Sequence, residues 1–250
     1  MSAPTGPRFG VKADLYRRLR PDYPDSVFER LLAETGEARG VAVDLGAGSG
    51  QATGRLLQLF DRVIAVEPDA DMAARIPADP RLEVRVQPAE DAVFDEPVDA
   101  MISATAFHWM DAARVCAMAA RSLRPGGVFM PFGYGPFTPK SPPGARDLAA
   151  AEYALWKPFA DPRLIAWRPY AEMIEATGLA RSVEAFEEAH ARAYAAEDAA
   201  GLLLTTSYAT AYGRTQGADY AEDFTRRMTE AAGGEPVTVG FDLMGAVARF

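Results

Sequence analysis

The sequence contains few cysteine and histidine residues. It holds one cysteine, Cys116, and two histidines, His108 and His190. One thiol can form neither an internal disulfide nor a cysteine-based zinc site. Two isolated histidines, among acids without ligand spacing, predict no metal site. Cys116 falls in an apolar helical pattern over residues 112–119, so we expect it in the core.

The chain also lacks blocks of lysine and arginine and long apolar runs. It has 26 Lys and Arg against 35 Asp and Glu, a net charge of -9 and a pI of about 4.9. Without a basic face, a nucleic-acid partner or an anionic membrane surface is not expected. The apolar runs are too short for a membrane span, and residues 1–10 contain no signal-peptide core. We therefore expect a cytoplasmic protein, either a monomer or a homodimer.

What the sequence does contain is a regular alternation of short apolar strands and helices. Strands are predicted at 41–45, 63–66, 82–86, 98–104 and 128–132, and helices at 51–60, from Asp69 to near Pro77, and from Asp111 to about Leu123. Ser26 and Glu29 have the spacing of a capping box ahead of an earlier helix. Such alternation predicts an α/β fold, Rossmann-like and doubly wound, with a mostly parallel sheet and ligands beyond the carboxyl ends of its strands.

The pattern changes at Gly133. Residues 133–144 contain four prolines and three glycines, and aromatic residues within helical segments follow them. These features predict a helical lid. Beyond it we expect a strand at 182–191, helices at 197–212 and 219–232, and a last antiparallel strand at 237–243, which gives a seven-stranded sheet. The expected segments are an N-terminal helical one (1–38), the ligand-binding core (39–132), the lid (133–180) and the elements that complete the core (181–250).

The most informative motif is a glycine loop between the first strand and its helix. Gly46, Gly48 and Gly50 stand at alternate positions, where the backbone can press close to a ligand. A dinucleotide fingerprint would need glycine where the chain has Gln51, and no phosphate-binding Gly-Lys-Ser/Thr follows. Asp44 ends the first strand and suits a ligand ammonium group. Glu67 follows the second strand, where its two carboxylate oxygens can accept both hydroxyls of a ribose.

These features together resemble the class I S-adenosylmethionine (SAM)-dependent methyltransferases, over about residues 10–132. Residues 67–72 resemble the family's ribose-binding turn, 88–91 the loop at the adenine edge, and 122–127 the turn before the fifth strand. Many relatives carry Asp where this chain has Pro88, so recognition of the adenine amino group falls to Glu90 or to the backbone of Ala89. The resemblance implies SAM as cofactor, with S-adenosylhomocysteine as product. The cofactor-binding residues that it implies are Asp44, Gly46, Ala47, Gly48, Gly50, Glu67, Pro68, Met72, Ala89, Glu90, Ala104, Tyr16 and Arg20.

An aromatic segment, residues 106–111, follows the fourth strand and narrows the resemblance to a small-molecule branch that includes trans-aconitate-type methyltransferases. The N-terminal pattern from Tyr16 to Pro24 also resembles that branch, where it folds over the amino-acid end of SAM. Three roles stay open for His108: a general base, a group that orients the acceptor, or a structural residue. The expected acceptor contacts are Tyr23, His108, Trp109, Tyr134, Trp156 and Trp167.

The sequence thus predicts a SAM-dependent methyltransferase that acts on a small molecule, most simply on a carboxylate or hydroxyl oxygen. Two alternatives stay open: a non-methylating reaction of SAM, such as a cyclisation that releases methylthioadenosine, and a non-catalytic SAM-binding protein. A nicotinamide dehydrogenase is a further rival, which Gln51 disfavours.

Overall fold

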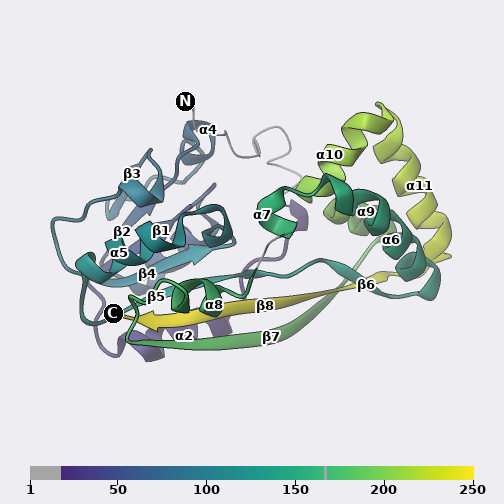
Figure 1. Cartoon of the computed structure of the whole chain (residues 1–250). Coiled ribbons are helices and arrows are strands. Elements are labelled where there is room, and N and C mark those ends of the chain that lie inside the picture. The colour runs from purple at the N-terminus through teal and green to yellow at the C-terminus, as the bar shows by residue number, and fades with distance from the viewer. Residues whose placement is uncertain (1–17, 166–167) are drawn as a thin grey trace. The chain divides into compact units, whose positions relative to one another are not determined.

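The structure is a computed structural model, and it describes residues 18–165 and 168–250 (Figure 1). The strands are β1 (Val41–Leu45), β2 (Arg62–Val66), β3 (Leu82–Arg85), β4 (Val98–Ala104), β5 (Leu123–Tyr134), β6 (Thr138–Ser141), β7 (Ser182–Tyr194) and β8 (Val237–Arg249). The α-helices are α2 (Asp25–Thr35), α3 (Gln51–Leu59), α4 (Ala70–Ala73), α5 (Ala112–Ser122), α6 (Pro143–Trp156), α7 (Pro162–Ile165), α8 (Tyr170–Glu175), α9 (Ala196–Leu204), α10 (Ser207–Gln216) and α11 (Tyr220–Ala232). Short 3-10 turns lie at η2 (Ala89–Asp91), η3 (Phe107–Trp109) and η4 (Lys157–Phe159).

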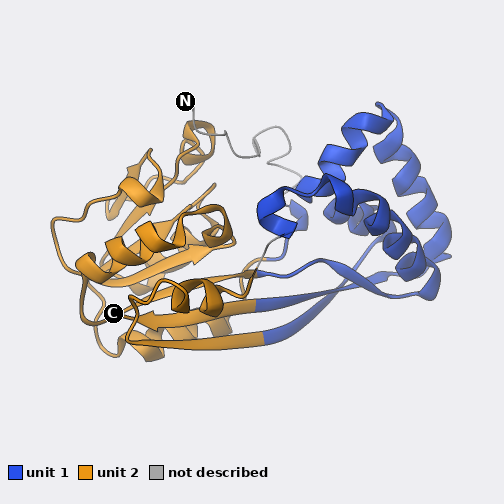
Figure 2. Cartoon of the chain, viewed as in Figure 1, with its two compact units in different colours: residues 1–21, 134–167, 188–243 blue, residues 22–133, 168–187, 244–250 orange. Residues whose placement is uncertain are grey.

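The chain divides into two compact units (Figure 2). Unit 1 comprises residues 1–21, 134–167 and 188–243, and unit 2 comprises residues 22–133, 168–187 and 244–250. The expected segments 133–180 and 181–250 each have residues in both units. Among the described residues, no helix combines the length and the apolar character that crossing a bilayer requires.

The sheet is mostly parallel, and its strands run in the order β3-β2-β1-β4-β5-β8-β6, with β7 also paired to β8. The pairs β1–β2, β1–β4, β2–β3 and β4–β5 are parallel, whereas β6–β8 is antiparallel. The predicted α/β class and the antiparallel last strand are therefore confirmed. The predicted number of strands is wrong, because the described residues form eight. The additional strand is β6, whose Pro139 is tolerated because the strand lies at the edge of the sheet.

In unit 2 the parallel strands lie between two layers of helices. Val43, Met101 and Phe129 pack into one apolar cluster with Val115 of α5 and Ile174 of α8. The residues between them in each strand point to the other face. There Thr53 of α3 bonds to Asp44, and Phe28 of α2 packs on Phe132. This is the three-layer arrangement that a βαβ pattern predicts.

Two predicted helix caps are confirmed in unit 2. Asp69 accepts hydrogen bonds from the Asp71 and Met72 amides at the start of α4, and Asp111 accepts one from the Arg114 amide at the start of α5. Both use a short carboxylate to satisfy amides that the first helical turn leaves unpaired.

Three local expectations are wrong. Helix α2 begins at Asp25 after Pro24, so Ser26 lies inside its first turn rather than at the N-cap. Strand β5 begins at Leu123 rather than at residue 128. The predicted helix at 197–212 is two helices, because the hydroxyls of Thr205 and Thr206 bond back to the carbonyls of Leu202 and Leu203 and end the first one.

The core of unit 1 is built mainly from helices α6, α9, α10 and α11, which pack on one another. At its centre, Trp156 of α6 meets Phe224 of α11 edge to face, with ring centroids 5.3 Å apart. A partly buried polar network joins the same two helices. Tyr220 accepts a hydrogen bond from the Trp156 indole and donates one to Glu152, each 2.6 Å long, and Glu152 also pairs with Arg227 at 2.7 Å.

Candidate functional site

The candidate site lies where three parallel strands of unit 2 end. The register pairs Leu45 with Val66 and Asp44 with Ile102, so the segments after β1, β2 and β4 leave the sheet at one edge. Ligands in open α/β sheets bind at this carboxyl edge. The glycine loop, Glu67 and the aromatic segment are therefore brought together as the alternation predicts.

The loop after β1 has a backbone that only glycine adopts readily. Gly46, Gly48 and Gly50 have φ values of 71°, 58° and 88°. A side chain is strained in this left-handed region, whereas glycine is not. The positive φ values therefore explain why glycine occupies these three alternate positions.

The loop is anchored on both sides. The amides of Gly46 and Ala47 both donate to the carbonyl of Val66, at 2.8 and 3.1 Å. A Cβ on Gly46 would come within 2.6 Å of the Ala106 Cβ and 2.9 Å of the Met110 Cε. The absence of a side chain thus lets the loop pack directly on the segment after β4.

Asp44 is a buried carboxylate with one oxygen in use. Its Oδ2 accepts a hydrogen bond from the Thr53 hydroxyl at 2.7 Å, whereas its Oδ1 is buried and has no hydrogen-bond partner among the described residues. Burial raises the pKa of Asp44 to about 6, and the nearby Glu67 contributes in the same direction. Buried acceptors of this kind need a partner, so Oδ1 marks a place for water or a cationic ligand group.

Glu67 joins the two loops through its carboxylate. Oε2 accepts a hydrogen bond from the Gly48 amide at 2.8 Å, and Oε1 accepts one from the Asp69 amide at 2.9 Å. Burial raises the pKa of Glu67, although the two amides oppose that rise. A carboxylate offers about four acceptor positions, so two hydroxyl groups can still be accepted.

The turn after Glu67 exposes Pro68 and half-buries Met72. The Met72 Cε lies 3.7 Å from the position that a Cβ on Gly48 would occupy. An apolar side chain thus borders the glycine loop, as packing against an adenine requires. Contact of Pro68 and Met72 with the cofactor stays a prediction.

The loop after β3 has its own internal contacts. Ala89 is buried, and the Glu90 Oε1 accepts a hydrogen bond from the Asp111 amide at 2.9 Å. Glu90 therefore already bonds the backbone at the start of α5, which leaves the Ala89 backbone as the simpler candidate for the adenine edge.

A strained residue follows Ala104 at the end of β4. Thr105 has φ of 56°, an uncommon value for a β-branched residue. Its hydroxyl lies 2.9 Å from the hydroxyl of Tyr23, whose ring meets Phe132 edge to face at 5.1 Å. Strain of this kind gathers at functional sites. Tyr23, predicted as an acceptor contact, is thus attached to the end of β4.

The predicted histidine lies in the turn η3. The Nδ1 of His108 is 2.8 Å from the hydroxyl of Tyr170, the first residue of α8. The rings of His108 and Trp109 lie 4.8 Å apart, and both residues are half-buried. No sequence pattern connects His108 with residue 170, which is distant in the chain.

Three predicted residues belong to unit 1. Arg20 lies over the ring of Phe137, with 5.0 Å from Cζ to the centroid, and its Nε is 3.5 Å from the Thr205 hydroxyl. Tyr134 is half-buried. Trp156 is a core residue, with its indole N–H bonded to Tyr220 as described above. Their roles toward cofactor and acceptor stay predictions, and Tyr16 and Trp167 lie outside the described residues.

Thr53, Thr105 and Tyr170 were missed by sequence reasoning. Thr53 could have been noticed as a polar residue in the first turn of the helix that follows the glycine loop. The backbone angle of Thr105 and the place of Tyr170 leave no signal in the sequence. Within residues 18–165 and 168–250, no group of three or more His, Cys, Asp or Glu side chains is arranged to hold a metal ion.

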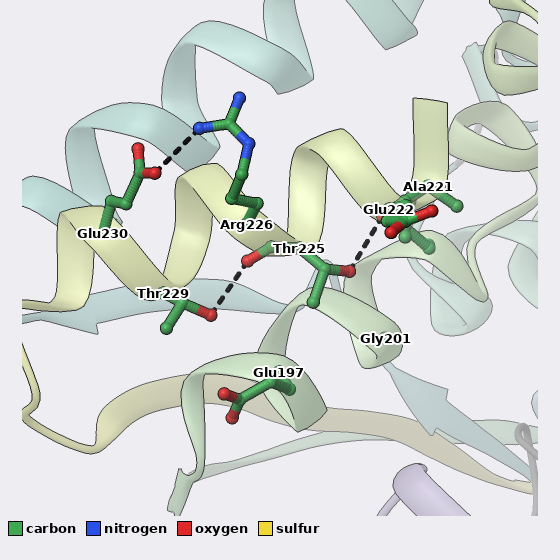
Figure 3. Close-up of a pocket in the computed structure, with 9 residues that line it drawn as sticks. Glu197, Gly201, Ala221, Glu222, Thr225, Arg226, Thr229 and Glu230 are labelled. Atoms are coloured by element: carbon green, nitrogen blue, oxygen red, sulfur yellow. Dashed lines mark hydrogen bonds and ion pairs between the residues drawn. The ribbon is translucent and has the colours of Figure 1, made fainter. Parts of the chain in front are cut away.

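Unit 1 also contains a groove, which is lined by other residues (Figure 3). It is lined by Glu197, Gly201, Leu204, Ala221, Glu222, Thr225, Arg226, Thr229 and Glu230. Several of its polar side chains bond within α11. The Thr225 and Thr229 hydroxyls donate to backbone carbonyls, and Arg226 pairs with Glu230 at 2.8 Å (Figure 3). The groove therefore contributes no residue to the candidate site.

Comparisons with known proteins agree with this geometry. Residues 43–130 match the family model described as a methyltransferase domain. An uncharacterized methyltransferase of Mycobacterium tuberculosis is 40% identical over 121 residues, which are 48% of this chain and 49% of that protein. A Saccharomyces cerevisiae protein, named as an S-adenosylmethionine-dependent methyltransferase, is 32% identical over 123 residues, 46% of this chain and 42% of that protein. The similarity thus spans about half the length of these curated relatives.

A solved structure extends the likeness to nearly the whole chain. A protein of Anaeromyxobacter dehalogenans assigned as a type II methyltransferase superposes with a TM-score of 0.76 at 30% identity, over 92% of this chain and 97% of that one. At this identity and coverage the likeness is one of family as well as of fold. None of these three proteins is named as a trans-aconitate-type methyltransferase, so the resemblance to that branch stays a prediction. The chain belongs to the class I SAM-dependent methyltransferases, whose cofactor is S-adenosylmethionine.

Proposed function

We propose that this protein transfers a methyl group from SAM to an oxygen atom of a small-molecule acceptor. One hydrogen bond carries the proposal. The Gly48 amide donates to the carboxylate of Glu67, the acid after β2, at 2.8 Å and so joins this acid to the glycine loop. SAM supplies an electrophilic methyl group on a sulfonium. The remaining requirement falls on the chain, which must bind this cofactor and align an acceptor with it.

The residues at the carboxyl edge fit SAM chemically. The Asp44 Oδ1 is buried and has no partner in the part of the chain that the structure describes, so it suits the ammonium group of the cofactor, directly or through one water. Glu67 keeps acceptor capacity for the two ribose hydroxyls after its two backbone bonds. Met72 supplies an apolar surface for the adenine, and the Ala89 backbone supplies a polar group at its edge.

In this proposal the chain accelerates methyl transfer by aligning the acceptor with the cofactor and by excluding water. Holding two reactants in line replaces a bimolecular encounter, which can lower a barrier by about 7–11 kcal/mol. The glycine loop permits close approach because Gly46, Gly48 and Gly50 have no side chains. His108 lies in η3, two residues after its cap at Ala106. Its role in the proposal is to contact the acceptor, either to orient it or to take its proton.

Calorimetric titration with SAM tests the cofactor half of the proposal. Asp44→Ala and Glu67→Gln should each weaken binding by about 10- to 100-fold, as loss of a hydrogen bond to a charged group implies. Glu37→Gln is the matched control, because Glu37 is exposed in the same unit and has no part in the site. Unchanged affinity in both site variants would overturn the assignment of these carboxylates.

A labelling experiment tests the chemistry. The protein is incubated with deuteromethyl-labelled SAM and a small-molecule extract, and products are identified by mass spectrometry. A labelled ester or ether, formed with S-adenosylhomocysteine, supports the proposal. Methylthioadenosine without a labelled product would favour a non-methylating reaction, and saturable binding without turnover would favour a binding protein.

A further inference from the structure

Tyr170 meets His108 through a geometry that is specific for hydrogen bonding. The hydroxyl oxygen of Tyr170 lies 2.8 Å from the His108 Nδ1, the rings are 7° from parallel, and their centroids are 6.2 Å apart. With the hydroxyl in contact with Nδ1, this separation means that the rings meet edge to edge. The ring-nitrogen lone pair or N–H lies in the plane of the imidazole, so this arrangement is the one that a directional hydrogen bond needs.

The Tyr170 side chain is held in place from several sides. Its residue is 5% exposed, and its ring packs on Phe107 at 5.7 Å with an angle of 70°. Phe107 in turn packs on Phe129 of β5 at 5.2 Å. A Cβ on Gly133 would lie 3.1 Å from the Tyr170 hydroxyl. The hydroxyl therefore has a fixed position, and the backbone beside it is kept free of a side chain.

Acid–base chemistry favours Tyr170 as the donor. A phenol is a good donor and a weak acceptor, whereas a neutral imidazole nitrogen is a good acceptor. Burial also raises the pKa of the Tyr170 hydroxyl, so the group keeps its proton. On this basis the Tyr170 O–H is assigned as the donor and the His108 Nδ1 as the acceptor, and a neutral imidazole with Nδ1 as acceptor carries its proton on Nε2.

We propose that Tyr170 is a positioning residue that fixes His108 as the Nε2–H tautomer, so that His108 offers the acceptor a hydrogen-bond donor and not a base. The part that concerns the acceptor rests on the proposed function, whereas the tautomer itself does not. A donor at this position suits an acceptor that arrives with its nucleophilic atom already deprotonated. It does not suit one whose proton His108 would have to remove.

Nuclear magnetic resonance of protein labelled with ¹⁵N-histidine tests the tautomer without any acceptor or cofactor. The chain has only two histidines, so the variant His190→Gln identifies the His108 signals. Long-range ¹H–¹⁵N correlations above pH 8 should give one tautomer, with the proton on Nε2. A proton on Nδ1 would overturn the proposal, and this measurement needs no change at Tyr170.

Tyr170→Phe removes only the hydroxyl and should release the fixed tautomer, seen as a changed Nδ1 signal. Tyr153→Phe is the matched control, because Tyr153 is 41% exposed in unit 1, and it should leave the His108 signals unchanged. Unchanged His108 signals in Tyr170→Phe would contradict the assigned hydrogen bond.

A second test uses turnover once an acceptor is known. In His108→Gln the side-chain amide N–H can stand in for the Nε2–H donor, so this variant should keep kcat within about tenfold of the unmodified protein. His108→Ala should lose more, and SAM affinity should change in neither. A loss of about 10² or more in His108→Gln, the size expected for removal of a general base, would overturn the donor role. Absence of turnover with every acceptor would count against the proposed function alone, because the tautomer is measured independently.

Discussion

Gly48 and Glu67 are joined by a hydrogen bond of 2.8 Å from the backbone amide of the first to the carboxylate Oε2 of the second. They are 19 residues apart, on loops that follow neighbouring parallel strands. The bond gives the acid a fixed position relative to the glycine loop. It also explains why a glycine-rich loop and an acid after the second strand act as one unit in the proposed cofactor site.

The glycine loop allows a comparison of two matched substitutions. Gly46→Ala and Gly48→Ala both place a side chain at positive φ, which costs about 1–2 kcal/mol. Gly46→Ala adds a clash, since its Cβ would lie 2.6 Å from the Ala106 Cβ, whereas the nearest atom to a Cβ on Gly48 is 3.7 Å away. We expect Gly46→Ala to cost about 1–3 kcal/mol more in urea unfolding. Equal losses would mean that the loop and the segment after β4 are not packed as described.

The affinity for SAM should depend on pH through Asp44. Its pKa is raised to about 6, chiefly by burial, so the carboxylate that attracts the ammonium group is lost as the pH falls below 6. The ammonium, with an ordinary pKa of about 7.7–8.0, stays charged in that range. Titrations between pH 5 and 7 should therefore give weaker binding at the acid end, approaching about tenfold per pH unit. In Asp44→Asn the affinity should start low and change less, and an undiminished slope there would assign the effect to another group.

Thr53 should affect the pH at which the affinity for SAM declines. Its hydroxyl bonds the Asp44 carboxylate at 2.7 Å and holds the pKa of Asp44 below the value that burial alone would give. Thr53→Val keeps the shape and removes the bond, so the midpoint of the binding–pH curve should move to higher pH. Thr229→Val, on an exposed position of α11, is the control and should not move it. A midpoint that stays in place in Thr53→Val would contradict the role given to this bond.

The partly buried polar network of unit 1 should contribute to stability. Tyr220→Phe removes the bond from the Trp156 indole and the bond to Glu152, both 2.6 Å, and leaves these groups without that partner. The expected loss in the free energy of unfolding is about 1–3 kcal/mol, followed by denaturant titration. Tyr153→Phe, on an exposed tyrosine of the same unit, should cost less than about 0.5 kcal/mol.

Cys116 should be inert in the folded protein. The residue is fully buried in α5, and burial raises the pKa of its thiol to about 11. Because the thiolate is the reactive form, a thiol reagent at pH 8 should react only after addition of denaturant. Rapid reaction without denaturant would mean that α5 opens readily. The sequence predicted this buried position from the apolar pattern around residue 116.

Much of unit 2 could be predicted from the sequence because its signals are local. Apolar runs fix the strands, Asp69 and Asp111 cap the helices that follow them, and strands that alternate with helices leave few topologies. The register then brings Asp44, the glycine loop and Glu67 to one edge. The pairing of Glu67 with the Gly48 amide could not be predicted, since it depends on the exact turn of two separate loops.

The region after residue 133 was less predictable. The prolines of 133–144 indicated an irregular segment, yet four of these residues form β6, which pairs antiparallel with β8. One long helix was predicted where Thr205 and Thr206 end α9 by bonding back to its carbonyls. These side-chain hydrogen bonds compete with continuation of the helix, and the periodicity of apolar residues does not indicate which of the two prevails.

The resemblance of the sequence motifs to a known family predicted the family and the cofactor class, and the period of apolar residues predicted the strand ends at which the cofactor residues stand. The sequence left the role of His108 open among base, orienting group and structural residue. Only the tertiary structure brought Tyr170 from a distant helix to 2.8 Å from the His108 Nδ1. The proton position on an imidazole depends on its hydrogen-bond partner, and that partner is set by packing rather than by neighbours in the chain.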